Sequence, residues 1–182
     1  LPQLAKSATE LIGADASSIG LLDSSGTLLE FVVHHGLSEA FAGRGSLRVG
    51  EGVAGKVVRD GEPVIAEDLE PDGRVVYRDK ILAEGLRSMV SVPLRYQDGI
   101  VGALTVYCRT PRRYSALEID VLCQFGNVAA IAIQNARLLD ELRERQVRLE
   151  ALLEVTRQLS RVQEVEPLLQ SIAAACAQLL DS

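Results

Sequence analysis

The sequence has few aromatic residues and no tryptophan. Aromatic residues make up 4% of its 182 residues, whereas hydrophobic residues make up 47%. A core of ordinary size can therefore form, but it has to be built mainly from Val, Leu, Ile and Ala. The length is sufficient for one domain with an appendage.

Positive charge is also scarce, and the formal net charge is −6 at pH 7. An acidic chain repels phosphate backbones, so we expect no nucleic acid among its partners. The densest basic cluster, Arg109 with Arg112 and Arg113, flanks Pro111. We expect a solvated turn there, with a contact to a partner or an anion as the alternative.

Cysteine is rare, and the pattern C-x-x-C is absent. Cys108, Cys123 and Cys176 are the three cysteines. An odd number without clustered spacing fits free thiols in a reducing compartment, and it argues against both a disulfide framework and a zinc site. We therefore expect a cytoplasmic protein.

Long apolar runs are missing as well. No signal peptide is recognised, and the most apolar stretch, residues 121–133, is interrupted by Gln124 and Asn127. A membrane-spanning helix needs roughly 18 or more apolar residues in a row. We expect no membrane contact in this part of the protein.

Local patterns predict two antiparallel hairpins between helices. Residues 23–26 form a turn between two apolar runs, and Asp98-Gly99 is the same signal in a second pair. Both strands of the second pair are apolar on both faces, so they should lie in the middle of a covered sheet. The expected elements are a helix to Gly13, strands 16–22 and 27–34, a short helix 51–59, a strand 64–67, a mixed loop and helix 70–84, and strands 87–95 and 100–107.

A long helix follows Ser115, which forms a capping-box pattern with Glu118. Residues 117–159 contain neither Gly nor Pro except Gly126. Such a helix would be about 65 Å long, so a domain of this size cannot bury all of it. Its core stripe is expected to include Cys123, Phe125 and Val128.

The second half of this helix carries a seven-residue repeat of leucines. With position a at Leu139, Leu142 and Leu149 fall at position d. The pattern predicts a parallel coiled-coil dimer, and a helix covered by another part of the same chain is the alternative. The residues assigned to the dimer helix are Leu139, Leu142, Leu149, Leu152, Leu153 and Leu159.

The end of the sequence repeats features of its beginning. Residues 160–164 are expected to break the helix, and Pro167 would begin a new one. Ile172 and Leu179 repeat the spacing of Leu4 and Leu11, 168 positions later. We therefore expect a domain at 1–137, a coiled-coil signalling helix or linker at 138–162, and the first helix of a truncated second domain at 163–182.

Two further motifs have a simpler explanation than cofactor binding. Residues 50–55 read G-x-G-x-x-G, a dinucleotide pattern, but no buried strand precedes them and an antiparallel hairpin follows. These glycines are better explained by a tight loop and a close approach of helix and sheet. His34 and His35 are adjacent, so they point to opposite faces of a strand and cannot both bind one ion; a single axial ligand to haem or iron is the alternative to a plain strand end.

Three segments together resemble GAF domains. The first runs from Gly50 through Glu62-Pro63-Val64 to Asp68, the second is 87–104, and the third is 129–138. The resemblance covers about residues 1–140. It implies an α+β fold with a central antiparallel sheet of about six strands. It also implies that the N- and C-terminal helices pack on one face, with a ligand pocket on the other under loops 36–50 and 68–86.

The resemblance implies a non-catalytic sensory or regulatory domain of a signal-transduction protein. Such a domain binds a small ligand and passes a conformational signal through a homodimeric helix to an output domain. A ligand-free dimerisation and transmission module is the alternative, and a thiol-based redox enzyme acting through Cys108 or Cys123 is a remote one. The bilin-binding Cys-His pair and the cyclic-nucleotide signature are absent, so the resemblance does not identify the ligand. Neither haem nor bilin is expected, and no cofactor or metal is required. The candidate pocket residues, chosen because they are polar among aliphatic neighbours, are Asp68, Tyr77, Arg78, Arg87, Ser88, Ser91 and Tyr107.

Overall fold

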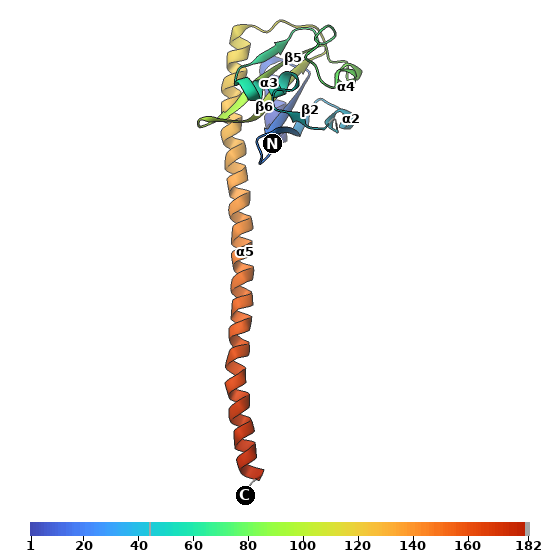
Figure 1. Cartoon of the computed structure of the whole chain (residues 1–182). Helices are drawn as coiled ribbons and strands as arrows, with labels where there is room; N and C mark the ends of the chain where they lie inside the picture. The colour runs from blue at the N-terminus through green and yellow to red at the C-terminus, as the bar shows by residue number, and fades with distance from the viewer. Residues whose placement is uncertain (44, 181–182) are drawn as a thin grey trace. The chain divides into compact units, whose positions relative to one another are not determined.

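The computed structural model of the chain describes the backbone of residues 1–43 and 45–180, and the side chains of these residues except 42, 155 and 157–180. It contains two compact units, Leu1–Asn135 and Ala136–Ser182. The elements, in chain order (Figure 1), are α1 Pro2–Ile12, β1 Ala16–Leu22, β2 Leu28–His35, α2 Glu39–Ala42, β3 Leu47–Arg48, α3 Gly52–Asp60, β4 Val64–Ala66, α4 Arg78–Ala83, β5 Ser88–Tyr96, β6 Gly99–Cys108 and α5 Ala116–Leu180.

The sheet of the first unit has six strands in the order β3-β2-β1-β6-β5-β4. Every pairing is antiparallel, and the two predicted hairpins are β1–β2 and β5–β6. The hairpins join where β1 pairs with β6, for example at Ile19 and Leu104. The expected α+β fold with about six strands is therefore confirmed, and β6 does lie in the middle of the sheet.

One face of this sheet is covered by α1 and the first part of α5. Ala8 of α1 and Leu122 and Ile133 of α5 pack in one cluster with Val90 and Leu104 of the sheet. This core is almost entirely aliphatic, as the scarcity of aromatic residues requires. The expectation that the first and last helices share one face is confirmed.

The other face is covered by α3 (Figure 1), and Phe41 of α2 and Ile81 of α4 pack beside it against Met89 and Tyr107. Val57 of α3 packs with Leu29 and Ala103 of the sheet. A Cβ atom added to Gly55 would lie 2.5 Å from the carbonyl oxygen of Arg48. Only glycine permits this approach of α3 to β3, so the G-x-G-x-x-G pattern has the packing role that was expected. Among the described residues the sheet contains no parallel pair, which a dinucleotide-binding unit needs.

The helix α5 begins as the sequence predicts. The backbone N–H of Ser115 donates to Glu118 Oε2 at 2.8 Å, and the N–H of Glu118 donates back to Ser115 Oγ at 3.3 Å. This reciprocal pair is the predicted capping box. Farther along α5, Cys123 and Phe125 pack against the core as expected, whereas Val128 is 64% exposed, so its expected place in the core stripe is wrong.

The predicted break at residues 160–164 is wrong, because α5 continues to Leu180. That segment contains neither Gly nor Pro, and its residues are ordinary ones for a helix interior. The side chains of Leu159 and Cys176 lie outside the described residues. The second domain expected to begin at 163 stays a prediction.

By length and composition, Ala116–Glu154 is the one helix in the described part of the chain that could cross a membrane. Gln124 and Asn127 interrupt this stretch, so no membrane-spanning helix was expected, but Ala, Val, Leu and Ile raise the mean hydropathy of the window. The core helix of a soluble domain meets the same criteria. Leu122, Ala130 and Ile133 are buried against the sheet, and this packing accounts for part of the apolar content.

Candidate functional site

A small cavity lies between the sheet and its α3–α4 cover. Its volume is about 30 Å³, enough for about two or three water molecules, whereas pockets for small ligands are on the order of 300–1,000 Å³. The lining residues come from four strands and two helices and the loop before α4: Phe31, Leu47, Gly52, Val53, Ala54, Val76, Tyr77, Ile81, Met89, Thr105 and Tyr107.

The floor of the cavity is formed over two pairs of hydrogen-bonded hydroxyl groups. The hydroxyl of Thr105 lies 2.9 Å from that of Ser91, and the hydroxyl of Tyr107 lies 3.1 Å from that of Ser18. All four residues are buried. They come from three neighbouring strands, β1, β6 and β5, so the polar part of the site is built on the interior strands of the sheet.

The α4 segment of the cover is tied to the domain by hydrogen bonds at both of its ends, at Tyr77 and at Glu84. Tyr77 precedes α4 with a φ of 58°, a left-handed conformation that is strained for a bulky residue. Its hydroxyl donates to the carbonyl oxygen of Ser46 at 2.9 Å. Within α4 itself, only Ile81 is buried. Ile81 is therefore the side chain by which α4 itself packs over the cavity.

The structure brings three of the predicted pocket residues to this cavity. Tyr77 and Tyr107 line it, and Ser91 is bonded to the lining residue Thr105. Ser88 differs from Ser91 by an odd number of positions, so it points to the opposite face of β5, where its hydroxyl donates to the carbonyl oxygen of Thr110 at 2.8 Å. Arg78 is exposed.

Asp68 and Arg87 lie away from the cavity and bind each other. Arg87 Nη2 is 3.2 Å from Asp68 Oδ1 and 2.8 Å from Glu70 Oε2. The backbone N–H of Glu70, and secondarily Arg87, lower the pKa of the Asp68 carboxyl. This ion group, in which Asp68 and Arg87 are half-buried, ties the loop after β4 to the start of β5.

Sequence reasoning missed the apolar wall of the cavity and Thr105. Met89 and Thr105 share the cavity face with Ser91 and Tyr107 because residues two apart on a strand point the same way. The alternation of β5 and β6, counted from Tyr107, was the signal that could have found them. The residues from α3 and the α4 loop could not be found in this way, because only the tertiary fold brings them there.

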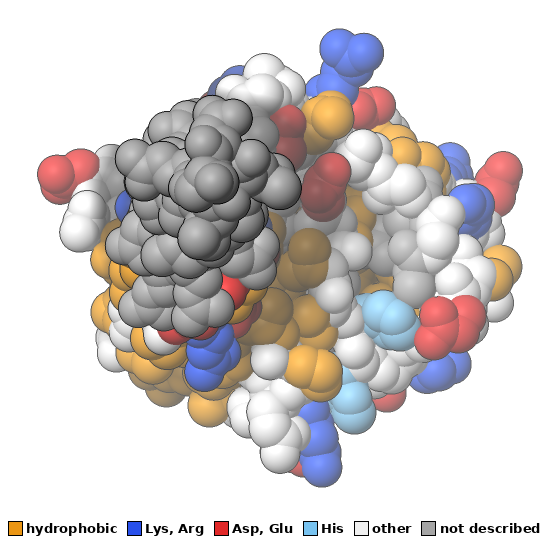
Figure 2. Space-filling model, turned by 90° about the horizontal axis from the view of Figure 1, so that it is seen from below, with side chains coloured by type: hydrophobic (Ala, Val, Ile, Leu, Met, Phe, Trp, Pro, Cys, Tyr) orange, Lys and Arg blue, Asp and Glu red, His pale blue; other side chains and the backbone are white. Residues whose placement is uncertain are grey.

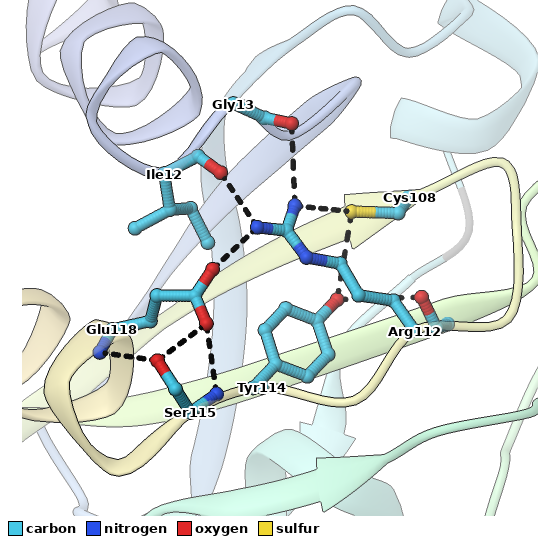
Figure 3. A network of polar contacts seen from close by, with 8 residues as sticks. Ile12, Gly13, Cys108, Arg112, Tyr114, Ser115 and Glu118 are labelled. Atoms are coloured by element: carbon cyan, nitrogen blue, oxygen red, sulfur yellow. Dashed lines mark hydrogen bonds and ion pairs between the residues drawn. The ribbon is translucent and has the colours of Figure 1, made fainter.

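A second polar group surrounds Arg112 (Figure 3), and it corrects the expectation of a solvated turn. The Arg112 side chain is only 26% exposed. Its guanidinium donates to the carbonyl oxygens of Ile12 at 2.9 Å and Gly13 at 3.3 Å, and it pairs with Glu118. One side chain thus joins the C-terminus of α1 to the N-terminus of α5.

Cys108 lies inside the same group, which we call the Arg112 network. Its sulfur is 3.4 Å from Arg112 Nη1 and 3.6 Å from the hydroxyl of Tyr114. Burial raises the pKa of Tyr114, so this hydroxyl stays protonated and can donate. The hydrogen bonds from Ser115 lower the pKa of Glu118 to about 2, so its carboxylate is charged at neutral pH.

The remaining candidate ligands form no metal site. His34 and His35 are both half-buried, and both histidine side chains reach the surface seen in Figure 2. Among the residues that the structure describes, no group of three or more His, Cys, Asp or Glu side chains could hold a metal ion.

The fold and the cavity define the class of protein: an α+β domain with two helices on one face of an antiparallel sheet and a covered cavity on the other. Within this class, the chain belongs to the GAF domain family, whose family model matches residues 1–134.

Solved structures agree with this fold. The GAF domain of a phosphoenolpyruvate-protein phosphotransferase from Coxiella burnetii is 21% identical, with a TM-score of 0.69 over 78% of this chain and 84% of that one. A domain of a putative two-component sensor histidine kinase from Sinorhizobium meliloti is 21% identical, with a TM-score of 0.64 over 78% and 93%. A type II free methionine-R-sulfoxide reductase from Thermoplasma acidophilum is 15% identical, with a TM-score of 0.60 over 73% and 91%. At these identities the similarity concerns the fold alone.

Proposed function

We propose that this chain is a sensory and regulatory domain that binds a small ligand between its sheet and the α4 cover and passes the resulting shift along α5 to an output domain. The observation that supports binding is the cavity, which combines an apolar wall with the hydroxyls of Thr105 and Tyr107 on its floor. This combination suits a small, mostly apolar molecule with one or two hydrogen-bonding groups.

The cavity has to enlarge before it can hold such a molecule. At about 30 Å³ it is closed to anything larger than a few waters. In this proposal the α4 segment is the element that moves, and Tyr77, with its left-handed backbone conformation, lies at its start. The ligand would therefore bind an open form. The smaller the population of that form is, the lower the apparent affinity of the ligand would be.

The strands β5 and β6 supply a route from the cavity to α5. Side chains alternate along a strand, so β6 presents Thr105 to the cavity and its neighbours Leu104 and Val106 to the core that contains α5. A small displacement of β6 would then be transmitted to the face of α5 that packs on the sheet. A coupling of about 1–3 kcal/mol between cavity and helix would make a useful switch.

A pocket-filling variant tests the proposal. Ala54 lines the cavity and is 6% exposed, so Ala54→Leu should occupy the space that the ligand needs. Ala40 is exposed, and Ala40→Leu is the control. The chain would be incubated with a total metabolite extract, washed, denatured and analysed by mass spectrometry. We expect a small molecule in stoichiometric amounts from the wild type and the control, and little or none from Ala54→Leu. Equal retention by both variants, or retention by none of the three proteins, would contradict ligand binding in this cavity.

A ligand-free dimerisation and transmission module is the second candidate function. It is favoured by the small size of the cavity and by its hydroxyls, which already bind each other. The retention experiment separates the two, because a transmission module would carry no molecule. Light scattering should still show such a module as a dimer.

We propose that the chain has no thiol-based activity. Cys108 is 3% exposed, and burial raises the pKa of the half-buried Cys123. A thiol with a raised pKa is a poor nucleophile at neutral pH, and a buried one is inaccessible. Incubation with free methionine-R-sulfoxide and dithiothreitol should give no turnover above background. Turnover that Cys108→Ser or Cys123→Ser abolishes would overturn this view.

A further inference from the structure

The segment between β6 and α5, residues 109–115, carries two arginines that each lie at the C-terminal end of a helix. We call this segment the arginine linker. Arg112 donates to the carbonyl oxygen of Ile12 at the end of α1, at 2.9 Å. Arg109 Nη1 donates to the carbonyl oxygen of Glu84, the residue that follows α4, at 3.2 Å. A cationic side chain in this position satisfies a free carbonyl group and complements the negative end of the helix dipole.

The two helices that these arginines reach belong to opposite faces of the sheet. Ala8 of α1 packs in the cluster that also contains the buried residues of α5. Ile81 of α4 packs in another cluster, with Met89 and Tyr107, beside the cavity. The arginine linker follows β6, an interior strand of the sheet, so one short segment contacts both the cover of the cavity and the helical layer.

Arg109 is held on both sides. A Cβ atom built on Gly85 would lie 3.4 Å from Arg109 Nη1, so the guanidinium lies against the turn that ends α4 as well as against its carbonyl oxygen. The backbone N–H of Arg109 donates to Asp15 Oδ2 at 2.8 Å, in the loop between α1 and β1. A displacement of the end of α4 therefore acts on a residue whose backbone is attached to the loop after α1.

The backbone of the arginine linker is bonded to the sheet side along its length. Ser88 Oγ donates to the carbonyl oxygen of Thr110 at 2.8 Å, and the backbone N–H of Arg112 donates to the carbonyl oxygen of Glu67 at 3.0 Å. Pro111, between these two bonds, has a φ angle fixed by its ring. A displacement at Arg109 is therefore carried along the linker to Arg112, since the segment between them has little freedom to bend.

Arg112 connects the linker to the start of α5 (Figure 3). Its guanidinium pairs with Glu118, which lies in the first turn of that helix. Glu118 also accepts from the backbone N–H of Ser115 at 2.8 Å, as part of the capping box. The side chain that holds the end of α1 thus also contacts the group that determines where α5 begins.

We propose that the arginine linker couples the α4 cover to the helical layer: Arg109 is a positioning residue that follows the end of α4, and Arg112 is a positioning residue that sets the start of α5 relative to α1. This inference rests on the proposed function and deepens it, because it adds a route from the cover to α5 that does not cross the core contacts of β6. When α4 moves away from the cavity, Arg109 loses its acceptor at Glu84, the linker shifts, and the Arg112 network loosens at the first turn of α5.

Hydrogen exchange of the full chain, read by mass spectrometry, tests this route without a ligand. Ile81→Ala loosens the cover, because Ile81 is the buried side chain of α4. The amides of residues 119–124 report on the start of α5, and those of residues 103–106 in β6 report on the opening of the whole domain. We expect Ile81→Ala to speed exchange at 119–124 by at least about 5-fold more than at 103–106.

The arginines are then replaced, with and without Ile81→Ala. In an Arg109→Met chain the cover is no longer tied to the linker, so adding Ile81→Ala should speed exchange at 119–124 by less than about 2-fold relative to 103–106. Arg112→Met should suppress the effect in the same way. Arg113→Met is the matched control: Arg113 is 90% exposed and approaches Glu67 at 3.4 Å, and its replacement should leave the full effect of Ile81→Ala in place. If the arginines only stabilised the domain, their effects would add to that of Ile81→Ala, so the loss of additivity is specific to coupling.

The outcomes separate this inference from the proposed function. If the full effect of Ile81→Ala persisted in Arg109→Met chains, the arginine linker would not be the route, and transmission across the sheet through β6 would stand. If Ile81→Ala in the wild-type background changed exchange at 119–124 no more than at 103–106, the cover would not be coupled to α5 by either route, which would overturn the inference and the proposed transmission together. The ligand-retention experiment on Ala54 reports on binding independently of all these variants.

Discussion

Replacing Arg112 is the sharpest test of how α1 is joined to α5. Arg112→Met keeps most of the apolar stem and removes the guanidinium. The C-terminal carbonyls of Ile12 and Gly13 then lose a charged donor, and Glu118 loses its ion partner. Cys108 also loses its contact at 3.4 Å. The side chain lies at the contact of three elements, so one substitution removes several interactions at once.

The magnitude follows from the exposure of the groups. A hydrogen bond to a charged partner contributes about 1.5–3 kcal/mol when buried, and an exposed ion pair about 0–1 kcal/mol. Arg112 and Glu118 are 26% and 30% exposed, which places the network between these limits. We expect Arg112→Met to lower the free energy of unfolding by about 2–3 kcal/mol in total. For a unit of this size the melting temperature falls by roughly 3–5 °C per kcal/mol.

The assay is urea unfolding followed by circular dichroism, with Arg113→Met as the matched control. Arg113 is the next residue, is 90% exposed, and approaches Glu67 at 3.4 Å. Its replacement should cost less than about 0.5 kcal/mol. Equal losses for the two variants would refute the reasoning, because the cost would then reflect the general loss of positive charge. A double-mutant cycle of Arg112→Met with Glu118→Gln should show coupling of about 0.5–1 kcal/mol.

Three further predictions concern the packing of the domain. The pKa of Glu118 in the folded state is lowered to about 2 from 4.5, so its charge stabilises the fold at any pH above its unfolded pKa. The difference in the free energy of unfolding between wild type and Glu118→Gln should therefore be largest near pH 7 and shrink as the pH falls from about 5 toward 2. A difference that grows on acidification would contradict this sign. Gly55→Ala should destabilise by more than about 1 kcal/mol in urea unfolding although alanine is the better helix former, because its Cβ would lie 2.5 Å from the Arg48 carbonyl oxygen; a stabilised variant would show that α3 is not held against β3. Leu104 is 1% exposed in the core, and Leu104→Ala should cost about 3–5 kcal/mol by calorimetry, with a loss below about 1 kcal/mol contradicting its place there.

The sheet and its helices could be predicted because their signals are local. Asp98-Gly99 between apolar runs defines a hairpin, and β5 and β6 were found within two residues of their ends. Ser115 and Glu118 are three residues apart, so their capping box could be read directly. Residues close in sequence carried each of these predictions.

The candidate site was harder to predict because its parts come from separate elements. Ser88 and Ser91 are both polar residues in an apolar strand, and only strand parity shows that Ser91 faces the cavity side. Polarity alone also selected Asp68 and Arg87, which are half-buried and bind each other away from the cavity. Composition identifies polar residues, but it does not say which side of a sheet they occupy.

The sequence by itself determined the α+β class, the aliphatic core, both hairpins and the long helix with its capping box, since each depends on periodicity or on a turn within a few residues. Only the tertiary structure decided which face of that helix is covered, because residues 117–135 are apolar on both sides and a period of 3.6 cannot choose between two apolar faces. It also decided the role of Arg112, whose partners Ile12 and Gly13 lie about a hundred positions away along the chain. Contacts across such distances depend on how the sheet closes, and no local pattern records them.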